Sequence, residues 1–464
     1  MRLESQLLKR TPITFAVLVA ASLVMLSCGT STPNPNQTIT SGLTFRAFVS
    51  NPLEPAAGGG GTPVLNIVNA ATDQLTGFRI SVASQLAQPG LMALTPDKKF
   101  TIVFSAANNA VSTVDNTNES LAVSGTQTLP VINLPGFTQS MFVGPDNATA
   151  YAAVPTATVL GQTPGAVIRM NLGVGTVSGM VAVPGVRYIV ASHTGSRILA
   201  MDGSSNILTL IAPSLIGTNA DARTLICPDG TPAAQYDVTL CASNPPLPRF
   251  DHPAWAVFSA DDTTAYIFNS GPERGGTTAS ITVLDLNTNS ATVTIPVEGA
   301  TFGLLVGTNL YVAGTPPTPP GINSCAGSTT LATTCGRLDA VDLGTMTVTS
   351  SAIITDGYHS HMELGANGRL FIGATGCTNV NVAPSGGNAG EIRGCLSMLN
   401  TSNSNVVVAP VNGDVTGIAP ITNRNVVYVA QAGELEIFDT TTDALQSKQI
   451  DIIGQAIDVK LVDK

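Results

Sequence analysis

The feature that most constrains this chain is a repeat of about 48 residues. Each copy has a Gly or Pro-Gly break, an apolar run, a tight Asp, Asn or Gly turn, a second apolar run, and two further runs after a loop. The segments GLMALTPDKKFTIVFSAA from Gly90 and PAWAVFSADDTTAYIF from Pro253 show the pattern. Repeats of about 40–50 residues with four short strands are typical of β-propellers. We therefore expect an all-β chain that forms a single propeller.

The spacing of the first runs predicts eight four-stranded blades. They are expected to start near residues 90, 138, 186, 253, 301, 359 and 416, with the eighth blade built from both ends of the chain. The C-terminal run AIDVKLVDK would supply the innermost strand of that blade, and the segments from LTFRAFVSN onward would supply the other three. Such pairing would remove an open sheet edge. Seven blades is the alternative, because residues 216–250 interrupt the unit that starts at Val186.

The repeats resemble the YVTN-type propeller repeats of bacterial surface proteins. The strand–turn pairs LTPDKKFTIVF and FSADDTTAYIF carry the resemblance, together with third runs such as VLDLNT. The resemblance covers about residues 43–464 and implies an extracytoplasmic propeller. It implies no particular chemical activity.

The N-terminal segment has the pattern of an export signal. Met1–Arg10 carries basic residues and Thr11–Leu26 carries no charge, as in a secretory signal peptide. The next residues, LSCG, resemble the lipobox of bacterial lipoproteins, which implies that residues 1–27 are removed and that Cys28 is lipidated.

This assignment divides the chain into three parts. Residues 1–27 are the lipoprotein signal peptide, residues 28–42 are the lipidated cysteine and a flexible tether, and residues 43–464 are the propeller. By the sorting pattern of Gram-negative lipoproteins, Gly29 after the cysteine implies the outer membrane of the cell envelope, facing either the periplasm or the outside.

Six further cysteines form three local couples, which are 14, 10 and 18 positions apart: Cys227 and Cys241, Cys325 and Cys335, and Cys377 and Cys395. Six cysteines allow 15 pairings. We expect the three local disulfides, because each would close one Gly-, Pro- or Ser-rich insertion. No CxxC motif and no His accompanies a couple, which argues against zinc. Disulfides agree with export to an oxidising compartment.

The composition limits the partners. Only 11% of the residues are charged and the net charge is −10, which argues against binding to nucleic acid phosphates. Hydrophobic residues make up 44% of the chain, enough for a large core, so general disorder is excluded. We expect a monomer that contacts the membrane through its lipid and binds a protein or a glycan.

The histidines are the main candidates for a site. Three of the four lie in loops between blades, where they would gather at one end of the central channel, and His359 and His361 would share one side of an extended strand. Imidazoles and carboxylates can hold a divalent metal, and Asp residues can orient an imidazole. The candidate ligand or metal residues are His252, His359, His361, Asp251, Asp356 and Glu363. The alternative is that these side chains pack and form hydrogen bonds at the rim.

Two functions follow from these observations. The first is a lipid-anchored extracytoplasmic propeller that acts as a binding or scaffold module for a protein or glycan. The second is a metal-dependent hydrolase or lactonase with the histidine cluster at the channel mouth. No P-loop, GxSxG or HExxH motif occurs, so catalytic residues are not assigned.

Two minor expectations concern packing and turns. Trp255, the only tryptophan, lies on a predicted innermost strand and should pack between blades. An aspartate recurs at the ends of third strands and should accept hydrogen bonds from backbone N–H groups of the following turn. These residues are Asp115, Asp285, Asp342 and Asp439.

Overall fold

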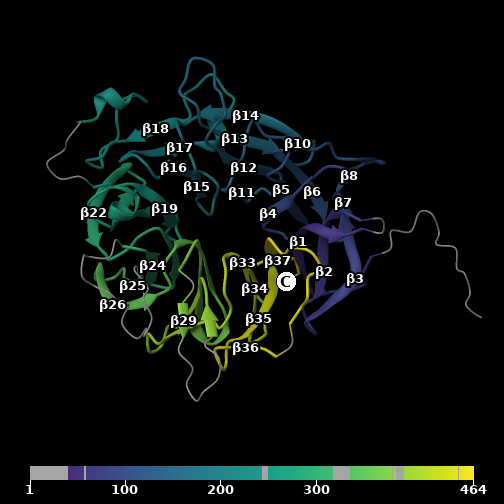
Figure 1. Cartoon of the computed structure of the whole chain (residues 1–464). Coiled ribbons are helices and arrows are strands. Elements are labelled where there is room, and N and C mark those ends of the chain that lie inside the picture. The colour runs from purple at the N-terminus through teal and green to yellow at the C-terminus, as the bar shows by residue number, and fades with distance from the viewer. Residues whose placement is uncertain are drawn as a thin grey trace, which may run out of the picture. The chain divides into compact units, whose positions relative to one another are not determined.

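The computed structural model describes residues 40–56, 59–242, 249–316, 335–378, 380–382, 391–447 and 449–463. The predicted signal peptide and Cys28 lie outside these residues. Within them, the strands form eight antiparallel sheets arranged in a ring (Figure 1). The predicted eight-bladed propeller is therefore confirmed, and the seven-bladed alternative is wrong.

Each blade contributes one strand to the inside of the ring. In blade order, these innermost strands are β37 (Asp458–Leu461), β4 (Pro89–Leu94), β11 (Met141–Val143), β15 (Tyr188–Ala191), β19 (Pro253–Phe258), β23 (Phe302–Val306), β27 (Tyr358–Leu364) and β33 (Val415–Pro420). The second strands are β1 (Arg46–Pro55), β5 (Phe100–Ser105), β12 (Thr149–Val154), β16 (Ile198–Met201), β20 (Thr264–Asn269), β24 (Asn309–Gly314), β28 (Arg369–Thr375) and β34 (Val426–Gln431).

The third and outer strands complete the blades. The third strands are β2 (Gly61–Asn69), β6 (Ala110–Asp115), β13 (Ala166–Asn171), β17 (Leu208–Ile211), β21 (Ser280–Asp285), β25 (Gly336–Asp342), β31 (Leu396–Asn400) and β35 (Glu434–Asp439). The outer strands are β3 (Gln74–Ser81), β10 (Ile132–Asn133), β14 (Thr176–Ala182), β18 (Arg223–Ile226), β22 (Ser290–Pro296), β26 (Thr347–Ile354), β32 (Val406–Val408) and β36 (Ala444–Leu445).

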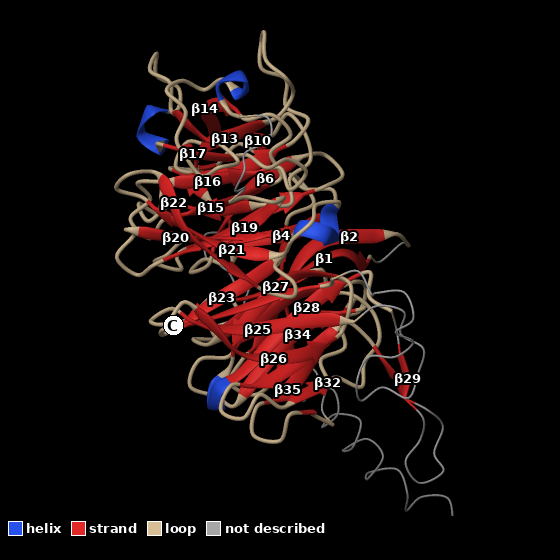
Figure 2. Cartoon of the chain, turned by 90° about the vertical axis from the view of Figure 1, so that its left-hand side faces the viewer, coloured by secondary structure: helices blue, strands red, loops and turns tan. Residues whose placement is uncertain are grey.

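Blade 2 departs from the four-strand pattern, because β7 (Ser120–Leu121) also pairs with β6 at the outer edge. Two small hairpins lie outside the blade sheets: β8 (Val123–Ser124) with β9 (Gln127–Thr128), and β29 (Val380–Val382) with β30 (Glu391–Arg393). Short 3-10 turns lie in the connections between strands and are drawn as helices in Figure 2: η1 (Pro213–Leu215), η2 (Val238–Leu240), η3 (Gly271–Arg274) and η4 (Ala366–Gly368). No helix in the described residues is long and apolar enough to cross a bilayer.

The first blade combines strands from both ends of the described chain. Strand β37 pairs antiparallel with β1, and Ala47 lies opposite Leu461. Nearby, the Arg46 guanidinium donates two hydrogen bonds of 2.8 Å to the Asp463 carboxylate and one of 2.7 Å to Glu119 of blade 2. Because these side chains are largely buried, this ion network ties the two ends to the neighbouring blade.

The core is divided into eight apolar clusters, one at each contact between neighbouring blades. Successive residues of a strand alternate between two of them: Val427 and Val429 pack toward blade 7, whereas Tyr428 packs toward blade 1. Both faces of a blade are therefore buried, which explains why the strands read as nearly continuous apolar runs.

The recurrent aspartates accept hydrogen bonds from backbone N–H groups of the following turns, as predicted. Asp115 Oδ1 accepts hydrogen bonds from the backbone N–H groups of Thr117 and Asn118, and Asp342 Oδ1 does the same for Gly344 and Thr345. The equivalent bonds are present at Asp285 and Asp439. These aspartates fix the tight turns between third and outer strands.

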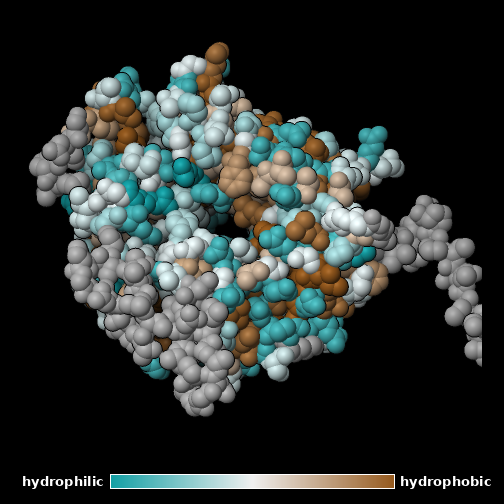
Figure 3. Space-filling view, in the orientation of Figure 1, coloured by the Kyte–Doolittle hydropathy of each residue, from teal (hydrophilic) through white to brown (hydrophobic). Residues whose placement is uncertain are grey.

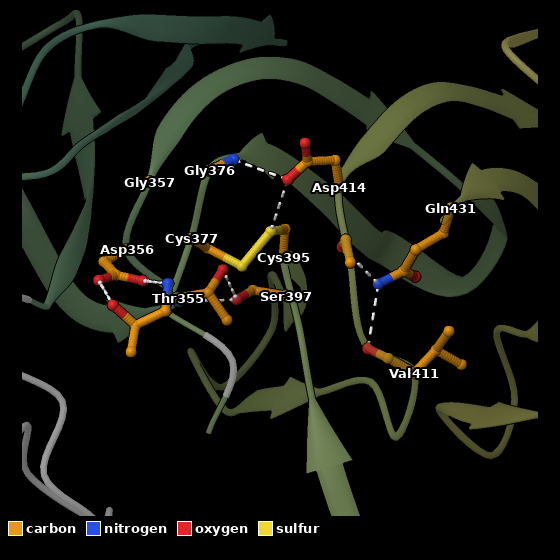
Figure 4. Close-up of a disulfide and its surroundings, with 12 residues drawn as sticks. Thr355, Asp356, Gly357, Gly376, Cys377, Cys395, Ser397, Val411, Asp414 and Gln431 are labelled. Atoms are coloured by element: carbon orange, nitrogen blue, oxygen red, sulfur yellow. Dashed lines mark hydrogen bonds between the residues drawn. A yellow bond between two sulfur atoms is a disulfide. The ribbon is translucent and has the colours of Figure 1, made fainter. Parts of the chain in front are cut away.

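Two of the three predicted disulfides are confirmed. Cys227 pairs with Cys241, and Cys377 pairs with Cys395 (Figure 4). The third predicted couple, Cys325 with Cys335, lies partly outside the described residues, because Cys325 is not among them.

Candidate binding cavity

A cavity of about 1010 Å³ lies on the axis of the ring. Figure 3 shows an opening near the middle of the ring, bordered in part by hydrophobic residues. Every innermost strand contributes to the lining, in blade order from β37 with Asp458, Leu91, Met141, Ile189, Trp255, Phe302, His361 and Thr416. The cavity is thus enclosed by the fold as a whole rather than by one blade.

Aromatic side chains form one side of this cavity. The rings of Trp255 and Phe302 lie with their centroids 4.8 Å apart, and Tyr188 meets Trp255 edge-on at 6.4 Å. A second cavity of about 580 Å³ is also lined by Trp255 and Phe302. Trp255 packs between blades, as predicted, and its half-buried ring also faces the cavity, which the sequence did not indicate.

Two tyrosines line the cavity at the end where the innermost strands begin, here called the entry end, and their hydroxyls contact the side chain of Arg274. Tyr188 and Tyr358 are the first residues of β15 and β27. Arg274 is the last residue of η3, which connects β20 to β21. Because β20 runs antiparallel to β19, the end of β20 lies beside the start of β19, so this connection lies at the entry end.

These three residues, the entry triad, are joined by short contacts. Arg274 Nη2 donates to the hydroxyl of Tyr188 at 3.1 Å and to that of Tyr358 at 2.9 Å. The two hydroxyls form a hydrogen bond of 2.7 Å with each other. The guanidinium carbon also lies 5.2 Å from the centroid of each ring, within range of a cation–π interaction. The triad therefore links blades 4, 5 and 7 across the entry end.

A polar group of side chains lies on β27 and β37. Burial lowers the pKa of His361 to about 4, and the charge of Lys460 acts in the same direction. Burial raises the pKa of Glu363, with an opposing effect of Lys460 and a reinforcing effect of Asp458. Lys460 Nζ lies 3.1 Å from Asp458 Oδ1. The side chains of His361 and Glu363 are surrounded by protein atoms on most sides, yet each still has solvent-accessible surface. This combination is expected for side chains that face a channel.

The structure does not bring the predicted histidines together. His361 lines the cavity, whereas His359 is only 1% exposed and bonds through Nε2 to the Thr355 carbonyl at 3.0 Å. A register shift between His359 and His361 explains the difference. The β-bulge breaks the alternation of side chains on which the prediction depended, so the two rings occupy different surroundings.

The aspartates predicted to orient these rings behave differently from each other. Asp251 contacts His252 Nδ1 at 2.8 Å, as predicted, and its other oxygen accepts bonds from Thr277 and Thr278. Asp356 instead accepts two bonds of 2.7 Å from Thr378 (Figure 4). Both carboxylates thus brace loops of their own blades.

The predicted metal site is not supported. Across the described ranges, no three His, Cys, Asp or Glu side chains are grouped so that they could hold a metal ion. Among the six candidates, His361 and Glu363 face the channel, whereas His252, His359, Asp251 and Asp356 belong to loop and blade contacts.

The entry triad was missed by sequence reasoning. Tyr188 and Tyr358 are 170 positions apart, and Arg274 lies in a loop with no recognisable motif. Their only shared signal is that both tyrosines stand at the start of a first strand, a position that points toward the axis.

No protein-family model matches this chain, and no curated protein sequence matches it. Similarity is found among solved structures. The dihydro-heme d1 dehydrogenase NirN in complex with DHE has a TM-score of 0.53 at 10% identity, over 90% of this chain and 75% of that chain. The Dos1 propeller has a TM-score of 0.50 at 9% identity, over 80% of this chain and 85% of that chain.

A third similar structure is the β-propeller domain of Cps50 (Swd1) from Myceliophteria thermophila. Its TM-score is 0.48 at 10% identity, over 74% of this chain and 93% of that chain. At such identities the similarity to solved structures concerns the propeller fold alone.

Proposed function

We propose that this propeller is a binding module that holds a small, largely apolar ligand in its axial cavity. The observation that carries the proposal is the lining of that cavity by residues from all eight blades, most of which are aromatic or aliphatic. A concave apolar site with a few polar groups is the usual form of a small-molecule site. Because no three metal-ligating side chains are grouped in the described residues, binding accounts for the geometry better than metal-dependent hydrolysis.

We further propose that the module works outside the cytoplasm, as a lipoprotein held in the outer membrane through Cys28. The two disulfides support an oxidising compartment, and the N-terminal export pattern agrees with it. The apolar wall favours a small molecule over a glycan, because sugar hydroxyls need more hydrogen-bonding groups than this wall offers. A protein partner would contact the outer loops.

The single tryptophan provides a direct test. Trp255 faces the cavity, so its fluorescence reports on occupation without a label. We expect the neutral apolar dye N-phenyl-1-naphthylamine to quench Trp255 saturably, and Phe302→Ala to weaken its binding. Phe78→Ala is the matched control, because Phe78 is 40% exposed on the outer strand β3. No saturable quenching, or equal weakening by both substitutions, would contradict the proposal.

A further inference from the structure

We infer that the cavity takes an amphipathic monoanion, whose carboxylate binds the entry triad while its apolar body lies along Trp255 and Phe302. This inference deepens the proposed function, since it assumes that the cavity binds a ligand. It concerns the chemical class of that ligand, and three observations carry it.

The first observation is the charge of Arg274. Its recorded partners are the two phenol oxygens and, at 3.4 Å, the Gly203 carbonyl, all of which are neutral. No carboxylate in the described part of the chain forms an ion pair with this half-buried guanidinium. The adjacent Glu273 attracts this charge, but its carboxylate accepts its hydrogen bonds from Thr301 and Thr315 of blade 6. Buried charges are usually held by charged hydrogen-bond partners, so a guanidinium whose hydrogen bonds go only to neutral oxygens favours an anionic ligand.

The second observation is a surplus of hydrogen-bond donors. The two phenols carry two hydroxyl hydrogens, and their mutual bond uses one of them. The other hydroxyl hydrogen has no acceptor in the described residues, and the guanidinium adds further N–H donors. In that bond Tyr358 donates to Tyr188, so the free hydroxyl hydrogen belongs to Tyr188. A carboxylate, which only accepts hydrogen bonds, complements this set.

The third observation is the distribution of the remaining charges. Asp458 is paired with Lys460, and Glu363 lies farther along β27, beyond His361. A carboxyl group thus lies toward the far end of β27, whereas the Arg274 guanidinium contacts the tyrosines at the entry end. The lining beside Tyr188, formed by Trp255 and then Phe302, offers apolar surface to the rest of the ligand. Arg274 is the single cation of the entry triad, which suits a head group with one negative charge.

The test uses ligands that share one apolar chain and differ in the head group. Decanoate, decan-1-ol, decyltrimethylammonium and decyl phosphate are titrated into the intact protein, with Trp255 quenching as the signal. We expect decanoate to bind most tightly. Arg274→Gln should raise its Kd by about tenfold or more, as for loss of a charged hydrogen bond, and leave the Kd of decan-1-ol within about twofold.

Each outcome decides between the proposals. Equal affinity for decanoate and decan-1-ol would overturn the anion inference and leave the binding cavity intact. Tighter binding of decyl phosphate would overturn the assignment to a monoanion. If none of the four ligands binds while N-phenyl-1-naphthylamine does, the inference fails and the proposed function stands. If Arg274→Gln does not fold, Tyr188→Phe is used, which removes a hydroxyl donor and should weaken decanoate selectively.

Discussion

Breaking the Cys377–Cys395 disulfide is expected to loosen the entry end as well as to destabilise the fold. The bond joins residues 18 positions apart, at the ends of the long loop between β28 and β31. In the chain-entropy description, a closed loop of this size contributes about 3 kcal/mol. With an unfolding entropy of about 2.1 cal/mol/K per residue over Ser41–Lys464, this corresponds to a loss of about 3–4 °C in Tm.

The surroundings of this disulfide explain why the effect should reach the cavity. Thr378, next to Cys377, donates two hydrogen bonds to Asp356, and Asp356 lies near this disulfide in Figure 4. The left-handed Gly357, with φ of 98°, follows Asp356 and leads into Tyr358 of the entry triad. A Cβ atom on Gly357 would lie 2.9 Å from the Cys377 nitrogen, so the two segments are closely packed. Release of the disulfide should therefore let the strand that carries Tyr358 move.

The measurement compares Cys377→Ala/Cys395→Ala with the wild type by thermal melting without reductant and by Trp255 emission. The matched control is Cys227→Ala/Cys241→Ala, whose disulfide spans 14 positions and predicts a loss of similar size. We expect both double variants to melt earlier and only the first to alter Trp255 emission. An unchanged Tm for the first variant would refute the stabilising role, and identical emission spectra would refute the link to the cavity.

Three further predictions address the fold, its pH dependence and the anchor. Asp463→Ala should lower the free energy of unfolding by about 3 kcal/mol, because it removes the bidentate partner of the largely buried Arg46. The control Asp97→Ala breaks a more exposed ion pair and should lower the free energy of unfolding by less than about 1 kcal/mol. Equal urea midpoints for the two variants would contradict this prediction. Burial lowers the pKa of His359 from 6.5 to about 4, so the unfolded chain binds that proton first and stability falls from pH 6.5 toward pH 4. His359→Gln should therefore flatten that part of the pH dependence of the urea midpoint, and an unchanged slope would count against it. Cys28→Ala should shift the protein from the membrane fraction to the soluble fraction, and persistent membrane association would argue against lipidation.

The sequence predicted the blades well because the signal for each one is local. The turn aspartates, the apolar runs and the disulfides Cys227–Cys241 and Cys377–Cys395 all involve residues close together in the chain. The blade that combines both ends of the sequence could also be expected. Three apolar runs near the N-terminal end and one apolar run at the C-terminal end together supply the four strands of one blade.

The cavity could not be predicted in the same way. The entry triad joins three blades, and no local pattern reports that a loop side chain of blade 5 contacts tyrosines of blades 4 and 7. The alternation expected for His359 and His361 was not found, for a related reason. The prediction assumed regular alternation along β27, whereas the bulge at Ser360 separates His359 from His361, and one irregular residue is not visible in a periodic pattern.

The neighbouring positions of β1 and β37 determine how the chain of this propeller can be circularly permuted. Because Ala47 lies opposite Leu461, the start of the first described strand and the end of the last one are adjacent in space. A short peptide that joined them would make the backbone of the ring continuous, and new ends could then be opened in any exposed connection between two blades. Circular permutants should thus keep all eight blade contacts, so the order in which the blades are translated is separable from the structure that they form.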